Sequence, residues 1–367
     1  MRTLSFGFLC VGAFFLTPGA LLGDVLPQFP PGSVWRQNVS GAAVHLSSPS
    51  MISTLQGLGG FGNGRMQIDF SIRVVRAAAG VATVPITSIV GGGPNDVYYS
   101  PDCDALGSAV PVPPGATIEG ETGMTCDVFG NDCHYLVTQG NTLFEVYRGT
   151  VAAGSMQSQC LATWQLNVVY PPQGRGEHCT SADAAGFPIA PMLFNADEIH
   201  ASLTLDATGN GDLGHAIRFI LPNPRMASDA SLGGVEGRLY VRPGSHAGGP
   251  SGPVGSVPYG ARLRLRSDFP LANYNPAARV ILNTLKRFGM VLADGGTVAL
   301  TAESDLYTTA KWVDFPLAAR VFDQTPSAAI VLISDFQVMD TGPRIAETYD
   351  CVPTVLPTGV IFQDGFE

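Results

Sequence analysis

Apolar and polar residues alternate along several stretches of the chain, which is the pattern of half-buried β-strands. In residues 66–73 the apolar side chains fall on one face and the polar side chains on the other. Similar segments predict strands at residues 161–170, 198–205, 215–221, 237–243 and 260–269. Residues 328–340 are almost continuously apolar, which predicts a strand that is buried on both faces.

The clearest hairpin is predicted in the stretch CHYLVTQGNTLFEVYRG, where two β-rich runs flank a Gly-Asn pair. A pair that begins with glycine suits a type II′ turn, which would place Gln139 opposite Thr142. Counting outward puts His134 and Glu145 on one face as diagonal neighbours, about 7 Å apart at the backbone. We therefore expect the imidazole and the carboxylate to come within reach of each other.

One amphipathic helix is predicted at about residues 275–288. Asn275 can cap its first turn, Pro276 suits the first helical position, and Gly289 can end it. A single helix among roughly ten strands predicts a mainly β fold. We expect a β-sandwich or a jelly-roll-like arrangement of antiparallel sheets, with the helix packed on one edge or face.

The chain begins with the features of a secretory signal peptide, which are a basic residue, an apolar run and small residues before Asp24. We expect a signal peptide at residues 1–23, a single β-rich domain at 24–342 and a flexible C-terminal tail at 343–367. The protein would then be secreted, periplasmic or held at the cell surface. No later apolar stretch approaches the ~20 residues of a membrane helix, so no transmembrane segment is expected.

Six cysteines remain once Cys10 leaves with the signal peptide. An even number of cysteines in an exported chain predicts three disulfides, although six cysteines allow about 15 connectivities. Proximity in the sequence favours Cys126 with Cys133 and Cys160 with Cys179, which leaves Cys103 for Cys351. A zinc site is disfavoured, because the chain has no C-x-x-C pair and no histidine at ligand spacing from a cysteine.

The composition narrows the classes of partner. Charged residues make up only 14% of the chain, and the formal net charge is −10. An acidic surface repels phosphate backbones, so we expect no nucleic-acid partner. With 44 glycines and 28 prolines the chain is turn-rich. One long loop-like segment, residues 91–123, is predicted to be either functional or pinned by Cys103. We expect a monomer.

No resident cofactor is predicted, and a calcium ion is an open alternative in the stretch DATGNGDLG. Asp206, Thr208 and Asn210 have the spacing of the first ligands of a calcium loop, but Ile217 stands where the final glutamate belongs. A polar loop is therefore the favoured interpretation, with a surface calcium kept open. The motifs G-x-S-x-G and H-E-x-x-H are missing, which removes the commonest esterase and zincin signatures.

Histidines and carboxylates near strand ends are the catalytic candidates. His134 with Glu145 is the best-argued pair, because a nearby carboxylate orients an imidazole and raises its pKa. A buried polar pair that only satisfies its own hydrogen bonds is the alternative. His215 begins a strand and is either catalytic or a buried core histidine.

The stretch CTSADAAGFPIAPMLFNADEIHASL supplies two further catalytic candidates. Asp183 lies in a small-residue turn beside Ser181, although both residues are also suited to capping a helix. Glu198 is expected at the start of a strand, on the same face as His200.

Ligand-binding candidates are basic and aromatic. Arg218 and Arg264 could seat an anionic group, and His246 lies in a glycine-rich loop, where sites concentrate. Tyr147 and Trp164 could stack on sugar rings.

Several stretches, taken in order, resemble a family of secreted bacterial proteins that has no assigned reaction. These are SVWRQNVS, GRMQIDFS, DCHYLV, LFEVYRG, CTSADAAGFPI, ADEI, HAIRFILPN, GARLRLRSDF and GMVLADGG. The resemblance runs from about Ser33 to about Asp340. It implies that the chain is one structural unit, and it supplies no activity.

The residue types favour a secreted carbohydrate-active enzyme, a glycoside hydrolase or a polysaccharide lyase, acting on an extracellular polysaccharide. Hydrolysis needs two carboxyl groups about 5–5.5 Å apart for retention or about 6.5–9.5 Å apart for inversion. A lyase needs a base and a cation that neutralises a uronate. The alternative is a non-catalytic protein that binds a polysaccharide or a cell-surface glycan through the same side chains.

Overall fold

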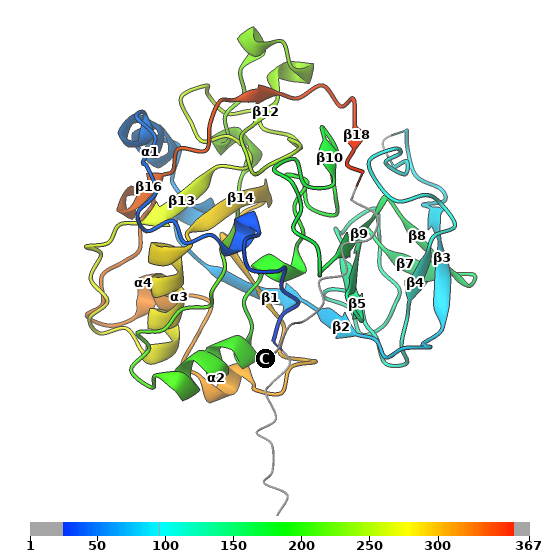
Figure 1. Ribbon diagram of the computed structural model, residues 1–367, viewed down its shortest axis with the longest axis horizontal. Coiled ribbons are helices and arrows are strands. Elements are labelled where there is room, and N and C mark those ends of the chain that lie inside the picture. The colour runs from blue at the N-terminus through cyan, green and yellow to red at the C-terminus, as the bar shows by residue number, and fades with distance from the viewer. Residues whose placement is uncertain (1–24, 95, 356–367) are drawn as a thin grey trace, which may run out of the picture.

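Strands exceed helices in the computed structural model, at 24% against 18% of residues. The model describes residues 25–94 and 96–355. The predicted signal peptide with Cys10, and residues 356–367 of the predicted tail, lie outside the described residues. The mainly β prediction is confirmed, whereas a β-sandwich is not (Figure 1).

The central feature is a six-stranded mixed sheet with the order β1-β15-β11-β14-β13-β16. Its strands are β1 (Ile68–Ile72), β15 (Leu300–Glu303), β11 (Ile217–Leu221), β14 (Met290–Gly295), β13 (Arg262–Leu265) and β16 (Phe336–Val338). β11 runs parallel to β14, and β1 runs parallel to β15, whereas β13 is antiparallel to both of its neighbours. β11 and β14 are mostly buried, as expected of apolar strands in the middle of a sheet.

Helices contact this sheet, where the sandwich prediction expected a second sheet. The α-helices of the described residues are α1 (Ser48–Gly57), α2 (Ala196–Leu205), α3 (Pro276–Arg287) and α4 (Val321–Gln324). α1 contacts β16, and α3 contacts β13. The predicted helix is confirmed as α3, because the Asn275 side chain accepts a hydrogen bond from the Ala278 amide at 2.9 Å. Short 3-10 turns lie at Val34–Arg36, Gly62–Gly64, Ala190–Met192, Asn223–Arg225, Ala230–Leu232, Val235–Gly237, Trp312–Asp314 and Ile333–Asp335.

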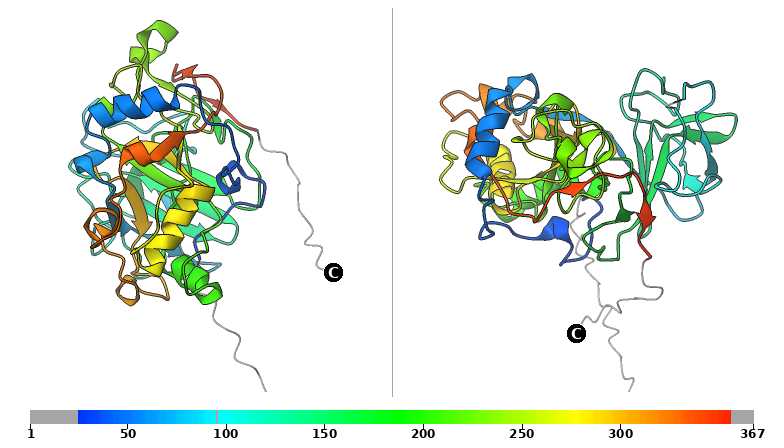
Figure 2. Two further views of the ribbon diagram at one scale, coloured as in Figure 1. Left: turned by 90° about the vertical axis from the view of Figure 1, so that its left-hand side faces the viewer. Right: turned by 90° about the horizontal axis from the view of Figure 1, so that it is seen from above.

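Residues 74–165 form a smaller lobe beside the large sheet (Figure 2). One four-stranded sheet contains β2 (Val74–Arg76), β5 (Tyr135–Gln139), β6 (Thr142–Tyr147) and β9 (Cys160–Gln165), and the other contains β4 (Ala109–Pro111), β3 (Thr83–Ser88), β8 (Ser155–Ser158) and β7 (Thr150–Ala152). Successive residues of a strand face opposite sides. Leu136 accordingly packs into the main core, and Val137 into the core of the smaller lobe. The sheet of β5 and β6 thus joins the two cores.

The predicted hairpin is confirmed in β5 and β6. Gln139 pairs with Thr142, and Leu136 pairs with Glu145, as the type II′ turn requires. Gly140 has φ of 58°, which glycine adopts at little cost.

Two strand predictions are wrong. Residues 198–205 belong to helix α2, because the Asn195 side chain accepts from the Glu198 amide at 2.8 Å and caps the first turn. The apolar run 328–340 forms only the short strand β16, because the Asp335 carboxylate accepts from the Leu332 amide and closes a turn just before it.

Three disulfides form, but two of the predicted partners are exchanged. Cys126 pairs with Cys133 as predicted, whereas Cys103 pairs with Cys160 and Cys179 pairs with Cys351. The first exchange arises because the segment around Cys103 lies beside β9, where the Asp104 amide donates to the Leu161 carbonyl. The second arises because β10 (Gly176–Glu177) pairs with β18 (Val352–Pro353). Three disulfides fit an extracellular or periplasmic protein.

The first part of the predicted tail is ordered by pairing. β17 (Ile345–Ala346) pairs with β12 (Leu239–Tyr240), and Glu347 is fully buried. This segment, red in Figure 1, then runs to β18 and the Cys179–Cys351 disulfide. The prediction of a flexible tail is therefore wrong for residues 345–353. Within the described residues, no helix has the length and apolar character needed to span a membrane.

Candidate functional site

A cleft of about 990 Å³ is lined by residues of both lobes. The smaller lobe contributes residues 97–100, Asp102 and Tyr147, and the larger lobe contributes residues from the loops that follow β11 and β14. β11 and β14 are parallel, so their carboxyl ends meet at one edge of the sheet. That edge is where open α/β sheets bind ligands. The volume lies at the upper end of the range for small-molecule sites.

Tyrosines form the wall of the smaller lobe. The Tyr98 hydroxyl donates to the Asp104 carbonyl and accepts from the Leu161 amide. The ring of Tyr99 stacks on Tyr147 with centroids 6.4 Å apart. These tyrosines are partly exposed and line the cleft. The long loop predicted at residues 91–123 is thus pinned by its cysteine to β9 and contributes to the candidate site.

Asp294 lies at the end of β14 and lines the cleft. Its carboxylate accepts a hydrogen bond from the Gly295 amide at 2.6 Å. Burial and the negative charge of Asp183 together raise the pKa of Asp294 to about 7, although Arg218 opposes the shift. A side chain on Gly295 would meet the Asn223 side chain at 2.6 Å, so glycine lets the two strand ends approach closely.

Asp294 was not among the residues predicted from the sequence. The available signal was an apolar strand that ends in aspartate followed by two glycines, in GMVLADGG. This pattern points to a site only when β14 is known to run parallel to β11, because the ends of parallel strands meet at one edge of the sheet.

Asp183 and Arg218, both predicted site residues, form a buried ion pair. The guanidinium donates two hydrogen bonds to the Asp183 carboxylate, at 2.9 and 3.0 Å, and one to the Thr301 hydroxyl at 2.9 Å. The Asp183 side chain is fully buried, and that of Arg218 is 4% exposed. The pair lies close enough to Asp294 for both charges to act on its pKa. Arg218 is therefore committed to Asp183 and does not line the cleft.

Ser181 serves the turn that holds Asp183. Its hydroxyl donates to the Phe187 carbonyl at 2.5 Å and accepts from the Asp183 amide at 3.0 Å. Gly186 has φ of 76°, and a side chain there would lie 2.1 Å from the Ser245 hydroxyl. The turn is thus closed by its own hydrogen bonds.

His246, which was predicted as a ligand-binding residue, lines the cleft in the larger lobe. Its Nδ1 lies 2.7 Å from the Ala184 carbonyl oxygen, which can only accept, so Nδ1 carries the proton. Burial lowers the pKa of His246, and Glu347 opposes the shift. The neutral ring therefore keeps a lone pair on Nε2. It stacks on Tyr349, with centroids 5.1 Å apart.

His134 and Glu145 share the predicted register, but each bonds to another partner. His134 Nδ1 lies 2.8 Å from the Glu119 carboxylate, because the Glu119 amide donates to the His134 carbonyl and brings the two chains together. Burial alone would lower the pKa of His134, but Glu119 raises it to about 9. The expectation of a His134–Glu145 pair is therefore wrong.

Glu145 is fully buried and binds backbone amides. Its carboxylate accepts from Ile189 and Ala190, each at 2.8 Å, and from the Trp164 indole at 3.1 Å. Burial raises its pKa to about 7, and the amides oppose the shift. Trp164 is itself fully buried, so the expectation that it stacks on sugar is wrong.

The remaining predicted residues lie away from the cleft. His215 Nε2 is 3.3 Å from the Glu198 carboxylate, and both side chains are buried between α2 and the start of β11. Arg264 donates to the carbonyls of Val39 and Ser40 and so holds the N-terminal segment. Its predicted role as a seat for a ligand is not supported, because its donors are used within the fold.

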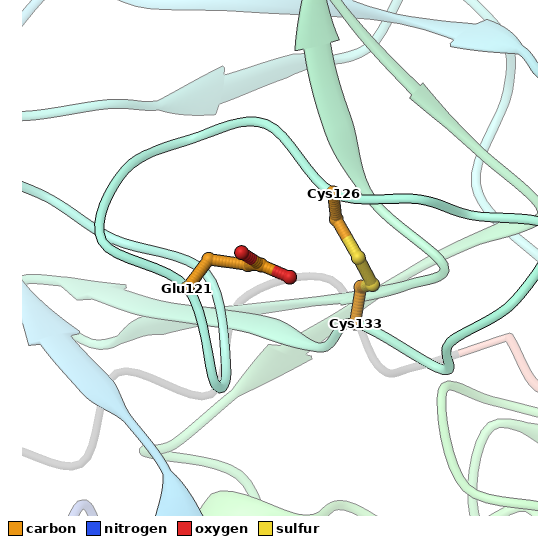
Figure 3. Close-up of side chains that lie close together, drawn as sticks. All are labelled: Glu121, Cys126 and Cys133. Atoms are coloured by element: carbon orange, nitrogen blue, oxygen red, sulfur yellow. A yellow bond between two sulfur atoms is a disulfide. The ribbon is translucent and has the colours of Figure 1, made fainter.

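The candidate metal ligands are engaged within the fold. The described residues contain one group of three potential ligands, Glu121, Cys126 and Cys133, but its cysteines form a disulfide (Figure 3). In the polar loop where a calcium ion was the open alternative, the Asp206 carboxylate accepts from the Thr208 amide and hydroxyl.

No protein-family model, curated protein or solved structure matches the chain. A functional assignment therefore depends on the cleft and its side chains.

The Arg218–Asp183 pair can be tested by its effect on stability. The change Arg218→Met leaves a buried carboxylate without its partner, which should lower the free energy of unfolding by about 3–5 kcal/mol in urea titrations. Adding Asp183→Asn should recover part of this loss. The matched control is Arg266→Met, which removes a half-exposed arginine and should cost less than about 1 kcal/mol. Equal losses for the two single variants would contradict the account.

Proposed function

We propose that the protein is an exported enzyme that cleaves an extracellular polysaccharide by acid/base chemistry in this cleft. Asp294 would act as the general acid and His246 as the general base. The observation that carries the proposal is a carboxyl group with a pKa of about 7 at the floor of a large open cleft. The pKa of Asp294 is raised and that of His246 is lowered. Enzymes that work near neutral pH commonly shift the pKa values of their acid and base apart in this way.

The walls of the cleft support a sugar ligand. Tyr98, Tyr99 and Tyr147 offer partly exposed rings from the smaller lobe, and Tyr349 offers one from the larger lobe. A sugar ring has apolar faces and polar edges. The tyrosine rings can stack on its faces, and the nearby hydroxyl and carboxyl groups can bond to its edges. A cleft of this size can hold several sugar residues of a polymer.

In this proposal the buried candidates have other roles. Glu145 anchors the segment that follows the Asp183 turn, while His134 is held by Glu119. Asp183 acts as a positioning residue, because its charge helps to keep the Asp294 carboxyl protonated. Asp294 thus takes the role of general acid, and Glu145 and Glu198, which the sequence pattern suggested as catalytic carboxylates, lie outside the cleft lining.

A non-catalytic glycan-binding protein is the second candidate. The tyrosine wall supports it equally, because stacking alone gives affinity. The shifted pKa of Asp294 favours the enzyme, since binding does not require a protonated carboxyl group. Retention on insoluble glycans without release of new chain ends would favour the binding protein.

The change Asp294→Asn tests the enzyme directly. It keeps the shape and the hydrogen bond from the Gly295 amide but removes the transferable proton, so turnover should fall by about 10²–10⁴-fold. Glycan affinity should change little. The control is Asp268→Asn, a carboxylate that is 73% exposed and does not line the cleft. Full release of reducing ends by the Asp294 variant would refute its role as the acid.

The pH profile of kcat/KM is a second test. Asp294 must be protonated to act as an acid, so the rate should fall as the pH rises through about 7. His246 must be neutral to act as a base, and its lowered pKa places the acidic limb below pH 6.5. In the Asp294→Asn variant the alkaline limb should disappear from the residual activity. An unchanged alkaline limb in that variant would assign it to another group.

A further inference from the structure

The lining of the cleft carries few charged groups at pH 7. Asp102 and Asp294 contribute carboxyl groups, Arg238 contributes a guanidinium, and His246 is neutral at pH 7. The Asp102 carboxylate accepts from the Thr180 amide at 2.8 Å, which fixes its position. Because the Asp294 carboxyl is protonated below about pH 7, Asp102 is the anion of the lining. Together with the net charge of −10 on the chain as a whole, it disfavours anionic ligands.

Arg238 is already occupied by the fold. Its guanidinium donates to the Gly248 carbonyl at 2.7 Å, to the Tyr349 hydroxyl and to the Glu236 carboxylate. It also lies over the Tyr349 ring, 5.4 Å from the centroid. This cation is balanced by Glu236 and holds the wall of the cleft, so it is poorly suited to neutralising a substrate carboxylate.

The basic residues behind the cleft are paired as well. Arg218 binds Asp183, Arg175 binds Asp104, and Arg148 binds Asp96. The two lysines of the chain hold backbone carbonyls elsewhere. Lys286 donates to Ser267 and Phe269, and Lys311 donates to Asp305 and Thr308. None of these five cations lines the cleft in the part of the chain that the structure describes.

We infer that the cleft accepts a glycan without carboxylate or sulfate groups, and that it cleaves this glycan by hydrolysis and not by β-elimination. The inference rests on the proposed function and narrows its substrate class. Elimination from a uronate requires a cation or a strong donor on the carboxylate, because that group must stabilise the carbanion formed when the adjacent proton leaves. Arg238 is held by Glu236, and in the proposed function the Asp294 proton is used on the leaving oxygen, so neither group is left to neutralise a uronate.

Hydrolysis uses the groups that are present. The bond between the anomeric carbon and the glycosidic oxygen breaks, and the leaving oxygen takes the proton of Asp294. A water oxygen bonds to the anomeric carbon, and its proton passes to Nε2 of His246, which here takes the place of the second carboxylate of most glycosidases. The two residues then exchange a proton through solvent and return to their starting states.

The experiment compares glycans of similar length in three classes. Uncharged β-glucan and xylan, amino-sugar polymers such as chitosan, and uronate polymers such as alginate and polygalacturonate are each incubated with the full chain. Reducing ends report hydrolysis, and absorbance of unsaturated sugars reports elimination. We expect new reducing ends from a polymer of the first or second class, no unsaturated product from any polymer, and at least about tenfold weaker binding of uronate oligomers.

The change Asp102→Asn tests the electrostatic cause, because the amide oxygen can still accept from Thr180. It should narrow the affinity gap between uncharged and uronate oligomers several-fold, while Asp268→Asn should leave the gap unchanged. Unsaturated products from a uronate polymer would overturn this inference and leave the proposed function standing. Cleavage of no glycan in any class would overturn both.

Discussion

The buried ion pair between Arg218 and Asp183 is the interaction on which the candidate site depends. It joins the loop after Cys179 to strand β11, and the Thr301 hydroxyl extends the network to β15. A buried ion pair is costly unless its hydrogen bonds are complete, and here both carboxylate oxygens are bound. One pair thus joins segments beside the cleft and, through the Asp183 charge, contributes to the raised pKa of Asp294.

The cleft is assembled from segments that are distant in the sequence. The disulfide between Cys103 and Cys160 fixes the tyrosine wall on the smaller lobe, and the disulfide between Cys179 and Cys351 fixes the segment that carries Tyr349. The floor comes from two parallel strands of the central sheet. Covalent and buried polar links therefore hold both walls of the cleft.

Local chemistry was predictable from the sequence, whereas pairing between distant segments was not. The Asn275 cap and the Gly140 turn were correct because each depends on a few adjacent residues. The partners of His134 and Cys103 were wrong because Glu119 and Cys160 approach them only through the sheet arrangement. Asp183 and His246 were named as candidate site residues from their residue types and their places in turns and loops. Asp294 could be named only once β11 and β14 were known to be parallel.

The central claim is that the Asp294 carboxyl group stays protonated near neutral pH. The most direct measurement is an NMR titration of the protein labelled with ¹³C at the aspartate carboxyl groups, with Asp294→Asn to assign the resonance. The account predicts that the resonance missing from the variant titrates near pH 7 in the unsubstituted protein. A midpoint near 4, the ordinary value for aspartate, would contradict it.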